Sequence, residues 1–304
     1  MFKLSYGTNG YQAYKVQEAI QKIKELGYEG IDLMADRPHA YPADLNQVER
    51  QILREFTQDL GIEIANLNAS SVSAIYEEEM KKLKGMNIPP SVEQFCAMYE
   101  PSFVSQSEEC RRKRIEYIKQ SIDLAVDLGV KNISTFSGIR LPGTPPAEAW
   151  EWLISGLEEC LDYAIRKQIK IALEPEPFHL IESIEDMVKL IEEVESKNLG
   201  INFDIGHCYC IEKSLDTICD AIGDLKDEII HLHVEDIKDK KHYHLIPGEG
   251  DIGEVGFRKI LETLKQIRYT GFLTVELYTY NTFPDFAAKQ AKQFLTRLLN
   301  KNNK

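Results

Sequence analysis

Four short apolar segments in the second half of the chain each end in a side chain of a type that binds divalent metals. The four residues are Glu174, Asp204, His233 and Glu276. Three carboxylates and one imidazole suit Mn²⁺, Mg²⁺, Co²⁺ or Zn²⁺, and the excess of oxygen ligands makes Mn²⁺ our first expectation. A single acidic residue at a strand end is often merely solvent-exposed. Four such ends in succession, whose carboxylates would repel one another without a cation, predict one metal site.

Histidines gather around these residues. Five of the seven lie between positions 207 and 244. His231 is two residues before His233 and shares its face of the strand, where we expect it to be a hydrogen-bonded core residue. His244 precedes a glycine-rich turn, and an imidazole there could contact substrate or a second metal. For His242, on the same segment, we expect plain solvent exposure.

Other reactive side chains nearby carry less information. Glu176 follows Pro175, and pointing at a substrate and plain exposure are equally open to it. Cys208 and Cys210 could bind a soft metal, but the oxygen-rich neighbours favour helix packing. Arg140 is a candidate for binding a substrate phosphate, with ordinary exposure as the alternative. The chain lacks a Gly-x-Ser-x-Gly elbow and a P-loop lysine motif, so nothing supports an esterase or a nucleotide hydrolase.

Strand and helix patterns alternate eight times and must position these side chains. Apolar, β-branched runs predict strands at residues 3–6, 30–34, 62–68, 130–136, 169–174, 200–204, 229–233 and 271–276. Helices, several with a glycine at their end, are expected at residues 16–27, 46–60, 109–128, 146–166, 183–195, 215–222, 254–267 and 284–299. Eight such units predict an α/β fold of the (β/α)8 TIM-barrel type. A doubly wound open sheet is the alternative, but residues 7–10 match poorly the glycine-rich turn that it needs.

The chain suits one large barrel. No change of composition divides its 304 residues, so we expect a single domain over residues 1–304. A long insertion at about residues 69–108 interrupts the alternation. Connections of this length in compact α/β proteins are usually functional, and we expect a lid or a subunit contact, compatible with a homo-oligomer.

The overall composition argues against several functions. A net charge of -13, from 49 acidic and 36 basic residues, would repel a phosphate backbone and argues against nucleic acid binding. No apolar run approaches the ~20 residues of a membrane span, and the N-terminus lacks the pattern of a signal peptide. Six scattered cysteines without a disulfide-like spacing indicate a reducing compartment. We therefore expect a cytoplasmic protein without membrane partners.

Several of these segments together resemble a known family. The resemblance is carried by Leu-Glu at 173–174, Phe-Asp-x-x-His at 203–207, His-x-His at 231–233, Pro-Gly-Glu-Gly-x-Ile at 247–252 and Val-Glu at 275–276. In this order they resemble the xylose isomerase-like TIM-barrel superfamily, which holds sugar and sugar-phosphate isomerases and epimerases and AP endonuclease family 2. Residues 25–33 are similar too, and the resemblance covers nearly the whole chain. It is specific for the superfamily and not for the substrate.

The resemblance implies one divalent cation, held by the four strand-end residues. It also implies that His207, three residues after the aspartate, contacts a substrate oxygen. His244 stands where the ketose epimerases of the family carry a substrate-binding arginine, and Leu180 stands where they carry a second glutamate. These departures leave the substrate class open.

Endonuclease IV, of the same superfamily, resembles this chain at Asp204, His207, His233 and His244. It needs further histidines at the ends of earlier strands for three zinc ions, and neither Asn68 nor residues 136–138 supply them. Together with the acidic charge, this argues against DNA repair, although a two-metal site stays open.

The implied activity is proton transfer beside a carbonyl group. A metal would bind carbonyl and hydroxyl oxygens of a sugar or polyol ketone and stabilise an enediolate, while Glu174 and Glu276 remove and return the proton. Return to the neighbouring carbon makes an isomerase, and return to the other face makes an epimerase. One alternative is a lyase of the inosose or dehydroshikimate dehydratase type, and another is a non-catalytic sugar-binding subunit. The sequence specifies neither the sugar nor whether it is phosphorylated.

Overall fold

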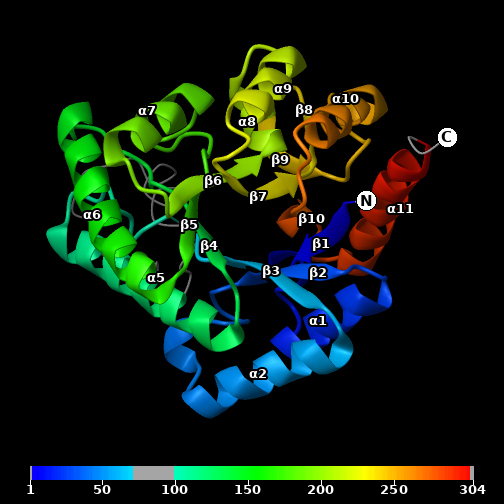
Figure 1. Ribbon diagram of the computed structural model, residues 1–304, viewed down its shortest axis with the longest axis horizontal. Helices are drawn as coiled ribbons and strands as arrows, with labels where there is room; N and C mark the ends of the chain where they lie inside the picture. The colour runs from blue at the N-terminus through cyan, green and yellow to red at the C-terminus, as the bar shows by residue number, and fades with distance from the viewer. Residues whose placement is uncertain (1, 71–98, 302–304) are drawn as a thin grey trace.

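Eight parallel strands close into a barrel at the centre of the molecule (Figure 1). The computed structural model describes residues 2–70 and 99–301, so most of the predicted insertion, residues 71–98, lies outside the described residues. Around the barrel the strand order is β1-β10-β7-β6-β5-β4-β3-β2. The strands are β1 (Lys3–Gly7), β2 (Gly30–Met34), β3 (Glu63–Asn68), β4 (Asn132–Thr135), β5 (Lys170–Leu173), β6 (Leu199–Asp204), β7 (Ile229–Val234) and β10 (Phe272–Val275).

Helices alternate with these strands and surround the barrel (Figure 1). They are α1 (Val16–Glu25), α2 (Gln47–Leu60), α5 (Glu108–Leu128), α6 (Pro146–Lys167), α7 (Ile184–Val194), α8 (Ile205–Ile211), α9 (Leu215–Asp224), α10 (Gly253–Gln266) and α11 (Pro284–Lys301). Short 3₁₀ turns are η1 (Thr8–Tyr11), η2 (Pro42–Asp44) and η3 (Tyr278–Tyr280). The (β/α)8 prediction is confirmed. Each predicted strand and helix is present, with ends within two residues of the prediction.

Side-chain caps and glycines explain why the helices begin and end so close to the predicted residues. The side chain of Asn46 accepts hydrogen bonds from the first backbone N–H groups of α2, and Glu49 bonds back to the backbone N–H of Asn46. At the other end of α2, Gly61 adopts φ +61°, a conformation that costs glycine little. Such local signals are readable in the sequence because they involve residues only a few positions apart.

Two elements near the barrel mouth were not predicted. One is the seven-residue helix α8, which begins directly where β6 ends. The other is a two-stranded hairpin of β8 (Asp236–Lys238) and β9 (Lys241–Leu245), which replaces the predicted loop around residues 242–244. Its two turn residues, Asp239 and Lys240, have φ values of +54° and +52°. Tight hairpin turns with positive φ favour Asn-Gly or Asp-Gly, and Lys240 stands where the glycine is usual, so the turn was not recognised from the sequence.

The barrel interior contains a ladder of polar side chains as well as apolar ones. His231 is buried, and its Nε2 lies 2.9 Å from the Thr274 hydroxyl, which confirms the expectation of a hydrogen-bonded core histidine. Asn66 donates to Asp32 at 2.9 Å and to Ser134 at 2.8 Å. Polar side chains from β2, β3, β4, β7 and β10 are therefore hydrogen-bonded inside the barrel.

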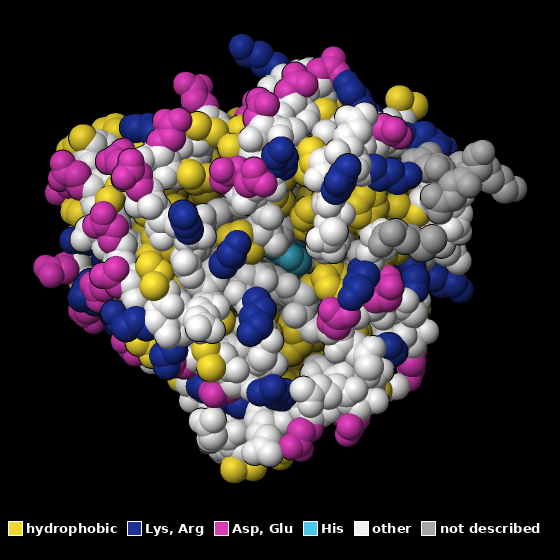
Figure 2. All heavy atoms as spheres, viewed as in Figure 1, with side chains coloured by type: hydrophobic (Ala, Val, Ile, Leu, Met, Phe, Trp, Pro, Cys, Tyr) yellow, Lys and Arg dark blue, Asp and Glu magenta, His cyan; other side chains and the backbone are white. Residues whose placement is uncertain are grey.

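Most of the buried apolar residues of the described chain belong to one cluster, and on this ground we propose a single domain. Acidic and basic side chains intermingle over the face seen in Figure 2, where a histidine lies in the central hollow. Among the described helices, none is both long enough and apolar enough to cross a membrane.

Candidate metal centre

The four predicted ligands lie together at the carboxyl ends of the strands. Glu174 follows β5, Asp204 ends β6, His233 lies near the end of β7, and Glu276 follows β10. One ligand atom of each lies within 4.8 Å of those of the other three, and all four side chains are buried. The closed barrel explains this convergence, because parallel strands bring their carboxyl ends to one rim. Their role as metal ligands stays a prediction.

His233 is the centre of this cluster. Its Nδ1 lies 3.2 Å from Glu174 Oε1, 3.6 Å from Asp204 Oδ2 and 3.7 Å from Glu276 Oε2. On the far side of the ring, Nε2 lies 2.7 Å from Asp32 Oδ2. Because an ionised carboxylate can only accept a hydrogen bond, Nε2 carries a proton, and in the neutral ring Nδ1 presents its lone pair to the cluster. Metal-binding histidines are typically oriented in this way by a carboxylate behind them.

The surroundings of Asp204 also suit a metal ligand. Its Oδ1 accepts a hydrogen bond from the backbone N–H of His207 at 2.7 Å, which caps α8. Its Oδ2 is buried and has no close hydrogen-bond partner within residues 2–70 and 99–301, although the buried carboxyl of Glu235, whose pKa burial raises well above its usual range, lies beside Asp204. A buried carboxylate oxygen without a partner is costly, and a cation at this point would satisfy it. The donor set and this unpaired oxygen therefore fit a divalent ion.

Burial and charge also act on Glu276. Burial raises the pKa of its carboxyl group, His233 opposes the shift, and the charges of Glu174 and Asp204 add to it, giving a pKa of about 7. Asn9 donates a hydrogen bond to Glu276 Oε1 at 2.8 Å. Glu276 is therefore held in position by an amide that the sequence did not mark as functional.

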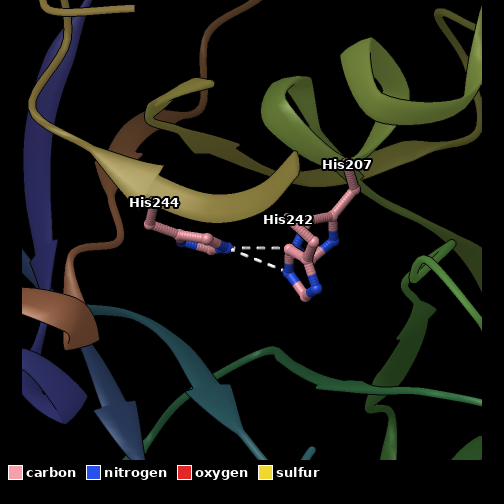
Figure 3. Close-up of side chains that lie close together, drawn as sticks. All are labelled: His207, His242 and His244. Atoms are coloured by element: carbon pink, nitrogen blue, oxygen red, sulfur yellow. Dashed lines mark hydrogen bonds between the residues drawn. The ribbon is translucent and has the colours of Figure 1, made fainter. Parts of the chain in front are cut away.

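The three remaining histidines of the segment 207–244 lie beside this cluster (Figure 3). The expectation of solvent exposure for His242 is wrong, because its side chain is only 10% exposed and its Nε2 lies 3.0 Å from His207 Nε2. The reason is the hairpin, in which successive side chains alternate between two faces. His242 and His244 point towards α8, whereas Tyr243 between them is 54% exposed.

Glu176 also belongs to the site. It is buried, and its two carboxylate oxygens lie 3.4 Å from His207 Nδ1 and 3.6 Å from His242 Nε2. Of the two alternatives for Glu176, exposure is therefore wrong. Burial raises the pKa of its carboxyl group to about 8, against the opposing charge of His207. Contact with a substrate stays a prediction.

A cavity of about 200 Å³ opens above these side chains. It is lined by Asn9, Gln12, Met34, Asn68, Ser70, Tyr99, Phe136, Glu174, Glu176, His207, His242, Glu276 and Tyr278. None of these described lining residues is a lysine or an arginine. The predicted phosphate contact Arg140 is exposed, donates to the carbonyl oxygen of Thr144 at 2.7 Å, and does not line the cavity.

The fold and this cluster define the molecule as a (β/α)8 barrel with a candidate metal site at the carboxyl ends of its strands. Residues 20–298 match the family model described as xylose isomerase-like TIM barrel, and the chain belongs to this family. The predicted family membership is thereby confirmed.

Relatives of the chain include named epimerases. It is 27% identical over 298 residues to fructoselysine 3-epimerase of Shigella flexneri, and the match covers 96% of each chain. The crystal structure of a D-tagatose 3-epimerase-like protein has a TM-score of 0.75 and 22% identity, covering 98% of this chain and 99% of that one. The IOLI protein with a bound zinc atom has a TM-score of 0.74 and 19% identity, covering 98% of both chains. At these identities the two structures show the shared fold.

Proposed function

We propose that this protein is a divalent-metal-dependent sugar epimerase or isomerase that moves a proton on the carbon beside a carbonyl group. The observation that carries the proposal is the pair of buried glutamates, Glu174 and Glu276, which belong to the metal-ligand cluster and also line the cavity. The similarity to a named 3-epimerase over nearly the whole chain supports the epimerase form.

The two glutamates approach the cavity from different parts of the rim. Glu174 follows β5 and Glu276 follows β10, and β6 and β7 separate these strands in the barrel. One carboxylate can therefore remove a proton from one face of a bound ketose while the other returns a proton to the opposite face. A divalent ion held by the cluster would supply positive charge that favours loss of that proton. We propose Mn²⁺ as this divalent ion.

The other lining groups suit an uncharged polyol. Asn9, Asn68 and Ser70 offer amide and hydroxyl groups, and Tyr99 and Tyr278 offer aromatic faces. Since the described lining contains carboxylates and no lysine or arginine, a phosphate group would meet repulsion. We therefore propose that the substrate is a ketose without phosphate, bound as a small molecule with His207 and Glu176 beside it.

Solvent-deuterium incorporation tests this proposal. The full chain loaded with Mn²⁺ is incubated in D₂O with a panel of ketoses and their phosphates, and deuterium at the exchanging carbon is measured by NMR. We expect incorporation into at least one unphosphorylated ketose together with formation of its epimer or isomer. An enone product with ultraviolet absorbance would indicate the lyase alternative, and a chain that exchanges no proton with any ketose would contradict the proposal.

Metal removal is expected to lower the thermal stability of the protein. Without a cation, the three carboxylates around His233 repel one another in a buried site. An ion present at about 100 times its dissociation constant adds ~2.7 kcal/mol of stability, which corresponds to a rise in Tm of roughly 5 °C for a chain of this size. Calorimetry of the full chain before and after chelation measures the difference. An unchanged Tm would contradict a buried metal in this cluster.

A further inference from the structure

The side chain of Arg114, on α5, carries a charge into the interior of the protein. It is fully buried and is the largest such side chain in the described part of the molecule. Burial lowers the pKa of its guanidinium group to about 10, so the group keeps its charge at neutral pH. Among the described residues, the carboxylates of Glu100 and Asp36 act on it as distant charges and not as hydrogen-bond partners. Because a buried charge is costly without close partners, other groups must stabilise it.

Carbonyl groups, a hydroxyl group and an aromatic ring surround the guanidinium group. Its Nη1 donates to the carbonyl oxygen of Ser70 at 2.7 Å, and its Nη2 donates to that of Ala69 at 3.1 Å. Nη2 also donates to the hydroxyl group of Thr135. The centre of the Phe136 ring lies 4.7 Å from the guanidinium carbon, a distance at which an aromatic face attracts a cation. The planar fork of an arginine suits this set of acceptors, which a lysine could only partly serve.

These contacts join two strand ends beyond the point where the strands pair. The last paired residues of β3 and β4 are Asn68 and Ser134. Ser70 and Phe136 lie past them, where the β3–β4 ladder no longer holds the backbone. Because Arg114 contacts residues that follow β3 as well as residues at the end of β4, it continues the connection where the ladder stops.

Ser70 and Phe136 both line the cavity. The hydroxyl oxygen of Ser70 is buried and has no hydrogen-bond partner within residues 2–70 and 99–301. A hydroxyl group of a bound sugar would satisfy it, and the ring of Phe136 offers an apolar surface for the C–H groups of the same molecule. The four predicted metal ligands belong to β5, β6, β7 and β10. The wall at β3 and β4 therefore suits the part of a substrate that the metal does not hold.

We propose that Arg114 is a positioning residue for substrate binding, whose guanidinium group holds Ser70 and Phe136 in the wall that receives the hydroxyl-bearing end of a ketose away from the metal. The inference rests on the proposed function, because it takes a ketose as the ligand. Arg114 itself neither lines the cavity nor belongs to the metal-ligand cluster. It therefore acts through the two residues that it holds.

Proton transfer depends little on this contact. Asn68 Oδ1 accepts from the backbone N–H of Ser70 at 3.1 Å, and Asn68 Nδ2 lies 3.4 Å from Glu276 Oε1. The second distance is at the limit of a hydrogen bond, whereas Asn9 donates to the same oxygen of Glu276 at 2.8 Å. Asn9 therefore keeps Glu276 in place if Ser70 shifts. We expect a loss of affinity for substrate with little change in the exchange rate at saturation.

Ketose binding tests the proposal. The full-length protein is loaded with Mn²⁺, and its affinity for D-fructose, D-tagatose and L-ribulose is measured by calorimetry before and after Arg114→Met. We expect the variant to bind roughly 10-fold more weakly, which corresponds to about one hydrogen bond. Its affinity for Mn²⁺ and its deuterium-exchange rate at saturating ketose should be unchanged, and a general loss of stability would not produce this selective effect. Arg114→Lys should recover part of the affinity, because an ammonium group keeps the charge.

Arg111→Met is the matched control. Arg111 lies three residues earlier on α5, donates to the carbonyl oxygen of Ser105 at 2.6 Å and stacks 4.1 Å from the centre of the Trp152 ring, and neither partner lines the cavity. This variant loses the same kinds of contact and should bind ketoses as the unmodified chain does. Equal ketose affinity in folded Arg114→Met and unmodified protein would overturn the proposal.

Ser70→Ala provides a second test that leaves the buried guanidinium group in place. It should weaken ketose binding by itself, and Arg114→Met should cause a smaller further loss in this background, because part of its effect passes through the Ser70 hydroxyl group. Unchanged ketose binding by Ser70→Ala would overturn the proposal even where Arg114→Met does not fold. Losses that simply add in the double variant would overturn it as well.

The proposed function is judged separately, by deuterium exchange in the unmodified chain. A chain that binds a ketose without exchanging its proton would contradict that function, and the comparison of binding would still decide on Arg114. A chain that binds none of the three ketoses would overturn both.

Discussion

Replacing Glu276 by glutamine is expected to lower the rate of proton exchange by roughly 10²–10⁴-fold, the usual contribution of a positioned acid or base. The amide has nearly the same shape, so Asn9 can still bond to its oxygen at this position. It cannot accept the substrate proton, and it removes one negative charge from the cluster around His233. The measurement is the deuterium-exchange rate at saturating Mn²⁺ and substrate, which keeps metal occupancy from limiting the result.

Glu262→Gln serves as the control, because Glu262 is an exposed glutamate on α10. This variant should exchange protons at the rate of the unmodified chain. If the fold of Glu276→Gln is intact by circular dichroism and its exchange rate at saturating metal is unchanged, Glu276 does not transfer the proton. In that case the mechanism would have to be assigned to other residues of the cavity.

The convergence of the four strand-end residues was predictable because it depends on a repeated local pattern. Each of Glu174, Asp204 and Glu276 comes at the end of an apolar run, and a closed parallel barrel brings such ends together. Nothing about their mutual distances had to be known. The same reasoning fails for any residue whose partner is set by the pairing of distant strands.

Asp32 is such a residue. It lies in the middle of β2, in a run of five buried residues, and its partner His233 is 201 positions away. A single acidic residue in an apolar strand can be a polar group of the barrel interior just as well as a residue that supports a functional site. The only signal in the sequence was that a carboxylate at a fully buried position needs a partner, and this signal does not identify which one.

His242 was misjudged for a different reason. Its position depends on the hairpin, whose turn uses positive φ at Asp239 and Lys240 without glycine or asparagine. Without the hairpin, residue 242 was expected to lie in a solvated loop. With it, residues 242 and 244 share the face that packs against α8, and the alternation along β9 that brings His244 into the site must bring His242 with it.

Replacing Asp32 by asparagine is expected to weaken metal binding at the carboxylate cluster by about 10–100-fold, the usual cost of losing a group that orients a metal-bound histidine. Asp32 accepts from His233 Nε2 through one oxygen and from Asn66 through the other. An asparagine has a single acceptor oxygen, so one of these two donors loses its partner. Either His233 is no longer fixed with Nδ1 towards the cluster, or the Asn66 ladder rearranges.

The measurement is the affinity of the stripped full-length protein for Mn²⁺ by calorimetry, since Mn²⁺ prefers ligand sets rich in oxygen. Asp59→Asn, at an exposed position of α2, should bind Mn²⁺ as the unmodified chain does. Asp32 does not line the cavity and is not one of the four proposed ligands, so a fall in affinity would act through His233 or through the loss of the Asp32 charge behind it. Unchanged affinity in a folded Asp32→Asn protein would show that the barrel alone holds His233 in place, and that the carboxylate behind it serves the interior hydrogen-bond network.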